Sequence, residues 1–197
     1  EDGHIESQEK PEVVDSQGTV NTPKNITDII IEETLRPLYE NKTPEEAAQY
    51  RIADICCGSG NFLLSAFEYI VNYHIEYYRN HARENAERRG DIYQLAGSTN
   101  YILSYEKKRS ILKNNIFGVD IDPLAVEVSK FSLLLKALEN SSLEEAEAFH
   151  QRTNQRILPN LDENIKNGNS LVNMAYARFD RSVYQNVSLM NKLKMFD

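Results

Sequence analysis

The sequence has no apolar run near the roughly 18 residues that a bilayer-spanning helix needs, and its acidic start does not resemble a signal peptide. Its two cysteines, Cys56 and Cys57, are adjacent, so they cannot close a useful loop and lack the spacing of a zinc site. The four histidines show no ligand spacing either. We therefore expect a cytoplasmic protein with no membrane span and no metal site.

Basic residues are too few to balance the acids: 22 lysines and arginines stand against 30 aspartates and glutamates, a net charge of −8. Because neutralisation of phosphates by basic side chains supplies most non-specific DNA affinity, this chain should bind DNA poorly by itself. The densest basic run, Lys107-Lys108-Arg109, is expected on the solvated face of a helix. Any binding of nucleic acid would have to come from other parts of the protein.

The remaining composition is that of one soluble globular domain, since 41% of the 197 residues are hydrophobic and 26% are charged. Residues 1–21 show no sustained periodicity, so we expect an irregular or partly helical lead-in there. Residues 22–197 are expected to form one unit. At its start, Thr22 and Pro23 predict an N-cap and the first residue of a helix over residues 23–35.

Two strand-to-helix units dominate the rest of the chain. The first has a strand at residues 51–55, a turn of small residues and a helix over residues 62–80. The second has a strand at residues 116–121 and a helix over residues 123–138 that Asp122 and a proline begin. Alternating strands and helices predict an α/β fold with a parallel sheet.

The segments around these units are less regular. Residues 80–100 are polar and predict an elaborated crossover, and residues 101–114 resume helical spacing. Ser142, followed by an acid three residues later, predicts another helix start. A strand is expected near Ile165 and weak helix over residues 182–197.

The turn between the first strand and its helix contains Gly58 and Gly60, which let backbone approach a ligand closely. Such a turn is structural about as often as it is functional. Asp120 sharpens the case because it ends the next strand, where a carboxylate can accept hydrogen bonds from both hydroxyls of a ribose. A capping role for Asp120 is better filled by Asp122. These features together predict a nucleoside site.

A nicotinamide cofactor fits this pattern poorly. Its fingerprint needs a third glycine where Leu63 stands, and its acid follows the turn by about twenty residues. Asp120 lies far beyond that distance from Asp54. The missing glycine also suits a cofactor without a pyrophosphate, since nothing then needs so close an approach to the helix terminus.

Three segments resemble motifs of the adenine-N6 DNA methyltransferases of restriction-modification systems, and the order of motifs is that of the gamma class. The first resembles the cofactor motif DPACGSGxFL, from which it departs at Ile55 and Cys56. The three segments are Asp54-Ile55-Cys56-Cys57-Gly58-Ser59-Gly60-Asn61-Phe62-Leu63, residues 114–126 and residues 158–171. A fourth, residues 18–23, resembles the amino-terminal cofactor motif, with Asn21 replacing the usual aromatic residue. The resemblance spans residues 18–172 and is closest to single-chain type II enzymes and to type I modification subunits.

The resemblance implies a partial Rossmann-like fold, the amino-terminal half of a methyltransferase domain, with S-adenosylmethionine as cofactor. Thr22, Asp54 and the backbone of the glycine turn would surround the methionine end, and Phe62 would pack nearby. Asp120 would hold the ribose, Ile121 would pack on the adenine, and Asn169 with Ser170 would meet its amino edge. Phe62 and Ile121 could instead be core residues. The implied cofactor-binding residues are Thr22, Asp54, Cys56, Cys57, Gly58, Gly60, Phe62, Asp120, Ile121, Asn169 and Ser170.

The family's catalytic Asn-Pro-Pro-Tyr sequence is absent from this chain, so we expect an inactive fragment with no catalytic residue of its own. The parent would methylate double-stranded DNA through its other parts, alone or with specificity or helicase domains or subunits. The first strand would lose one of its two neighbouring strands in such a fragment and would expose an edge. A dimer of the fragment through that edge is therefore also expected. An oxidoreductase, a non-catalytic scaffold and an RNA or protein methyltransferase remain as alternatives.

Overall fold

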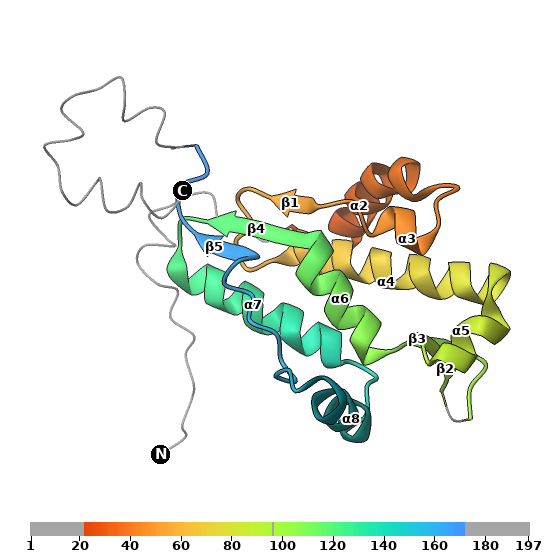
Figure 1. The fold of residues 1–197 in the computed structure, drawn as a ribbon. Helices are drawn as coiled ribbons and strands as arrows, with labels where there is room; N and C mark the ends of the chain where they lie inside the picture. The colour runs from red at the N-terminus through yellow and green to blue at the C-terminus, as the bar shows by residue number, and fades with distance from the viewer. Residues whose placement is uncertain (1–21, 96, 172–197) are drawn as a thin grey trace, which may run out of the picture.

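The computed structural model describes residues 22–95 and 97–171 (Figure 1). No helix within these ranges is both long enough and apolar enough to pass through a bilayer. The expected helix over residues 182–197 and the lead-in over residues 1–21 lie outside them. The elements in chain order are α2 (Lys24–Tyr39), α3 (Pro44–Ala47), β1 (Ile52–Asp54), α4 (Asn61–His81), α5 (Arg83–Arg89), β2 (Ile92–Gln94), β3 (Tyr101–Leu103), α6 (Tyr105–Asn115), β4 (Ile116–Asp120), α7 (Pro123–Leu138), α8 (Leu143–Thr153) and β5 (Ile165–Asn167).

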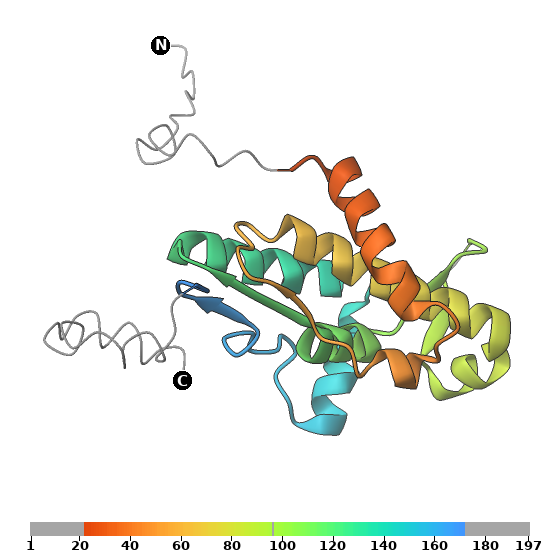
Figure 2. The same cartoon turned by 90° about the horizontal axis from the view of Figure 1, so that it is seen from above.

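A three-stranded parallel sheet in the order β1-β4-β5 forms the centre of the fold. Its register pairs Asp54 with Gly118 and Asp120 with Asn167, so all three strands end at one edge. Figure 2 shows α4 and α7, the helices that follow β1 and β4, on the same side of this sheet. The arrangement confirms the predicted α/β class and its partial Rossmann-like form. Within the described ranges β1 pairs only with β4, and dimerisation through its other edge stays a prediction.

Local capping chemistry sets most helix starts. The Asp122 carboxylate accepts the backbone N–H of Leu124 at 2.9 Å, with Pro123 at the first helical position, and the Ser142 hydroxyl accepts that of Glu145 at 3.1 Å. Both predicted starts are confirmed. The predicted strands at residues 51–55 and 116–121 and the strand near Ile165 are also present, each slightly shorter than or close to its expected length.

The first helix differs from the prediction at both ends. Thr22 is not its N-cap: Pro23 occupies that position, with no side-chain hydrogen bond, and the helix continues through Pro37 to Tyr39. Leu35 and Tyr39 are almost fully buried against the rest of the core. Burial of this stripe outweighs the unfavourable effect of the proline, because tertiary packing contributes more to most helices than local propensity does.

A β-hairpin stands where the sequence indicated a helical start. Residues 101–103 form β3, which pairs antiparallel with β2, and the helix begins only after Ser104, whose hydroxyl accepts the N–H of Lys107. Ile92 and Leu103 are opposite one another and both are buried. The prediction of a helix over residues 101–114 was therefore wrong at its beginning, because pairing with β2 decides the conformation of this apolar segment.

The basic run on α6 is not a solvated face. Lys108 is only 3% exposed, and its ammonium donates to the Glu139 carbonyl at 2.5 Å and the Ser141 hydroxyl at 2.8 Å. The Arg109 guanidinium lies 4.9 Å from the centroid of the Phe149 ring, a cation–π contact. These side chains hold α8 and the end of α7 to α6, so the predicted solvation was wrong.

Gly118, in the middle of β4, lies where α4 packs closely on the sheet, and a substitution there tests how close this packing is. A Cβ atom there would lie 2.7 Å from Leu63 Cδ1 and 3.1 Å from Cys57 Sγ. Gly118→Ala is expected to lower the free energy of unfolding by about 1–3 kcal/mol through overpacking. Urea unfolding would measure this, with Ala53→Ser at an exposed position of β1 as the control; equal stabilities for the two variants would contradict such close packing.

Candidate functional site

The carboxyl edge of the sheet brings Asp120 directly against the glycine turn. Asp120 Oδ2 accepts the Gly58 backbone N–H at 2.7 Å, and Oδ1 accepts the Asp122 N–H at 2.9 Å. Each carboxylate oxygen can accept a further hydrogen bond, so both remain able to receive hydroxyl groups of a ligand. The two features on which the nucleoside prediction depends therefore lie at one place, although their role toward a ligand stays a prediction.

The glycine turn has a conformation that other residues rarely adopt. Gly58 and Gly60 have φ of +53° and +89°. A Cβ atom on Gly60 would lie 2.6 Å from the Ser129 Oγ atom, while one on Gly58 would meet nothing within 4 Å. Gly60 is thus required by both backbone geometry and packing against α7, and Gly58 by backbone geometry alone.

Two polar residues outside the predicted set hold this edge together. Ser129 of α7, which is fully buried, donates its hydroxyl to the Gly58 carbonyl at 2.9 Å. Asn167, at the end of β5, donates to the carbonyls of Asp120 and Ile121, both at 3.0 Å. Neither residue stands out in the sequence, because each acts on a segment more than 40 positions away.

The two cysteines are part of the turn and differ in environment. Cys56 is exposed and its backbone N–H donates to Asp54 Oδ1 at 3.1 Å, whereas Cys57 is buried and its N–H donates to the Val119 carbonyl at 3.0 Å. Burial, followed by the negative charges of Asp120 and Asp54, raises the pKa of the Cys57 thiol to about 11. A thiol in that state is no nucleophile at neutral pH, so Cys57 contributes packing and backbone.

Two apolar candidates have different surroundings. Ile121, next to Asp120 in the chain, is 71% exposed, so the alternative that it is a core residue is wrong. Phe62 is partly buried and packs against the main core, as a structural residue does. Asn169 and Ser170 are exposed just beyond β5, and the side-chain Oδ1 atom of Asn169 accepts the Leu171 N–H at 3.0 Å. Thr22 is partly buried and lies two residues before the start of α2.

The described ranges contain no group of three or more His, Cys, Asp or Glu side chains able to hold an ion. Three of the four histidines lie there. His74 is buried, and the rings of His81 and His150 contact backbone carbonyls near their own helices. His4 lies outside the described residues.

A parallel sheet with a glycine turn after one strand and a carboxylate at the end of its neighbour defines the class: a partial Rossmann-like fold of the methyltransferase type. A family model for the DNA-methyltransferase domain of MmeI matches residues 35–181, and the chain belongs to this family.

Curated relatives carry names of the same kind. The chain is 37% identical over 170 residues (86% of the chain) to the type II restriction enzyme and methyltransferase RM.Eco57I of Escherichia coli. It is 29% identical over 124 residues (63% of the chain) to the adenine-specific methyltransferase PglX of Streptomyces coelicolor. These matches cover 16% and 8% of the relatives, so the chain spans a small part of their length.

Proposed function

We propose that this chain is the S-adenosylmethionine-binding part of an adenine-N6 DNA methyltransferase from a restriction-modification system, and that it does not transfer methyl groups by itself. The observation that carries the proposal is the contact between Asp120 and the Gly58 backbone at the carboxyl edge of the sheet. In open α/β sheets, ligands bind at that edge.

The residues at this edge suit a nucleoside. Asp120 holds the ribose hydroxyls through the acceptor positions that its backbone contacts leave open. Ile121 offers an exposed apolar surface for a planar base. Asn169 and Ser170, exposed beyond β5, contact the amino edge of that base.

The opposite side of the turn accommodates the amino-acid end of the cofactor. Asp54 and the backbone of residues 56–60 surround this end, with Thr22 approaching from the start of α2 and Phe62 packing beneath. Gly58 leaves open space where a side chain would stand, which permits close approach of the ligand. When bound, the cofactor supplies a methyl group on a sulfonium centre. This chain's residues bind and orient that centre.

The DNA substrate is held by other parts of the parent protein. A net charge of −8 opposes binding of a polyanion by this chain, and electrostatic attraction supplies most non-specific affinity. The target adenine would be turned out of the double helix and presented to the cofactor by the parent's catalytic sequence. Specificity or helicase domains or subunits would supply sequence recognition, and the cytoplasm is the expected compartment.

Isothermal titration of this chain with S-adenosylhomocysteine tests the proposal. We expect saturable binding with one site per chain and no methylation of DNA by the isolated chain. NADH serves as a control ligand, because the glycine spacing opposes a dinucleotide. Heat with NADH but not with S-adenosylhomocysteine would indicate an oxidoreductase. Heat with neither would indicate a scaffold whose pocket has lost its function.

A further inference from the structure

The interface between α2 and α4 has two chemically different halves. Toward the end of α2, the side chains of Ile31, Leu35 and Tyr39 are buried in the main core. Its first turn is held instead by polar groups, of which Thr27 and Ser65 are buried. The first turn begins at Lys24, two residues after Thr22, so the placement of this turn constrains the position of Thr22.

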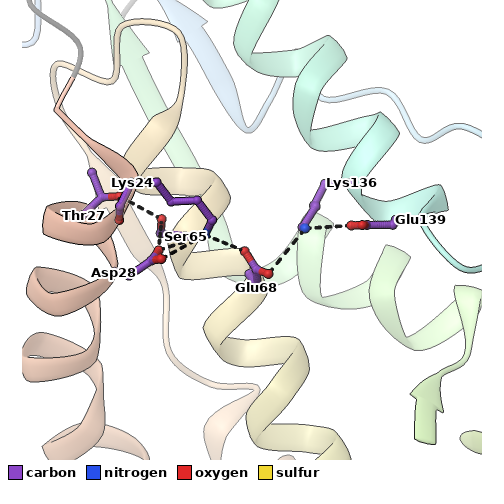
Figure 3. A network of polar contacts seen from close by, with 7 residues as sticks. All are labelled: Lys24, Thr27, Asp28, Ser65, Glu68, Lys136 and Glu139. Carbon is purple, nitrogen blue, oxygen red and sulfur yellow. Dashed lines mark hydrogen bonds and ion pairs between the residues drawn. The ribbon is translucent and has the colours of Figure 1, made fainter. Parts of the chain in front are cut away.

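Figure 3 shows the polar half as a continuous network across α2, α4 and α7. Ser65 of α4 donates its hydroxyl to Asp28 Oδ1 at 2.7 Å and lies 3.1 Å from the Thr27 hydroxyl. Lys24 Nζ donates to Asp28 and to Glu68, in both cases at 3.0 Å. The second Glu68 oxygen lies 3.5 Å from Lys136, which also pairs with Glu139 at 2.7 Å.

The Ser65–Asp28 hydrogen bond is the central link. Ser65 has one proton to donate, and the Asp28 carboxylate is a stronger acceptor than the Thr27 hydroxyl. Thr27 in turn donates to the Lys24 carbonyl at 2.8 Å, which closes the first turn of its own helix. The Ser65 hydroxyl, followed by the Lys24 ammonium, holds the pKa of the Asp28 carboxyl below its usual value, so Asp28 stays ionised.

This network lines a cavity that extends to the first residue of α4. A cavity of about 210 Å³ lies between Lys24 and Thr27 on α2 and Asn61, Leu64 and Ser65 on α4. Asn61 directly follows Gly60. The first turn of α2 therefore shares this hollow with the first residue of α4, which follows the glycine turn of the candidate site.

The exposure of the two charged residues of α2 indicates that their ion pair sets geometry more than stability. The side chains of Lys24 and Asp28 are 66% and 46% exposed. Ion pairs this accessible to water contribute little to the free energy of unfolding, since solvent screens them and their long side chains lose freedom. The apolar half of the interface supplies the packing.

We propose that Ser65 and Asp28, aided by Lys24, are positioning residues that fix the first turn of α2, and so place Thr22 against the amino-acid end of S-adenosylmethionine. This inference rests on the proposed function. The network then makes the protein bind ligands that carry the amino-acid end more tightly than ligands that lack it. The ribose and base contacts at Asp120 and Ile121 lie outside the network.

The test compares two ligands in four proteins by isothermal titration. S-adenosylhomocysteine carries the amino-acid end, and 5′-methylthioadenosine lacks it. Ser65→Ala is expected to weaken S-adenosylhomocysteine binding about tenfold, the equivalent of one hydrogen bond to a charged group, and to leave 5′-methylthioadenosine unchanged. Asp28→Asn, which can still accept from Ser65 but loses the pairing with Lys24, is expected to show a smaller loss.

Glu139→Gln is the matched control, because it breaks the α7 end of the same network without touching α2. We expect wild-type affinity for both ligands and similar melting temperatures in all four proteins. Equal losses for both ligands, or no loss, would overturn the positioning role. Absence of S-adenosylhomocysteine binding by the wild type would instead overturn the proposed function, and this inference with it.

Discussion

Replacement of Asp120 by alanine is expected to weaken binding of S-adenosylhomocysteine by about a hundredfold or more. The carboxylate is proposed to accept both ribose hydroxyls, and each hydrogen bond to a charged group contributes about 1.5–3 kcal/mol. The variant also removes the acceptor of the Gly58 N–H, so the turn loses the contact that fixes it to β4. Titration calorimetry measures the loss directly.

Asp122→Ala is the control for this prediction. Its carboxylate lies two residues away and caps α7 by accepting the Leu124 N–H at 2.9 Å. Loss of such a cap costs about 1 kcal/mol of stability, which urea unfolding detects. The affinity of Asp122→Ala should stay within about threefold of the wild type, a difference of less than 1 kcal/mol. Equal losses of affinity in both variants would show that a general effect on the fold, and not ribose binding, explains the result.

Acidification from pH 6.5 to pH 4 is expected to remove about 3 kcal/mol from the free energy of unfolding through His74 alone. Burial, together with the nearby Lys107 ammonium, lowers the pKa of His74 to about 4. Between that value and the ordinary 6.5, the unfolded chain binds a proton that the folded chain does not. Stability therefore falls as pH falls through this window, and the contribution of His74 is constant above it.

His74→Phe isolates this contribution. Phenylalanine can fill the space between Tyr73 and Tyr78, whose ring centroids lie 5.7 and 6.0 Å from that of His74, and it does not titrate. Urea unfolding of both proteins from pH 4 to pH 8 should show a much shallower slope below pH 6.5 for the variant. Parallel slopes would contradict a neutral, buried imidazole. The carboxyls with lowered pKa values, such as Asp28 and Asp162, lose their contributions only at lower pH.

Helix starts were predictable because the groups involved are close in sequence. Asp122 and Ser142 bond N–H groups two and three residues ahead, so the pattern contains the whole interaction. The β2–β3 hairpin was not predictable in this way, since the same apolar residues suit a helix until a partner strand is known. The extension of the first helix through Pro37 depends likewise on what α4 offers for burial.

The residues of the site also fall into those that the sequence pattern could indicate and those that it could not. Asp120 and the glycines were predictable because parallel strands bring their carboxyl ends to one edge, whatever the loops between them do. Ser129 and Asn167 were not, because a serine within a helix and an asparagine after a strand have many ordinary uses. The burial of Lys108 belongs with these, since its acceptors on Glu139 and Ser141 lie about 30 positions along the chain.

The unequal surroundings of the adjacent thiols have a practical use. A maleimide or iodoacetamide dye can reach the exposed Cys56, while Cys57 is buried in the main core. The chain thus carries a single attachment point for a fluorophore within the proposed site, beside Asp54. Occupancy could be followed through such a probe without introducing any new residue.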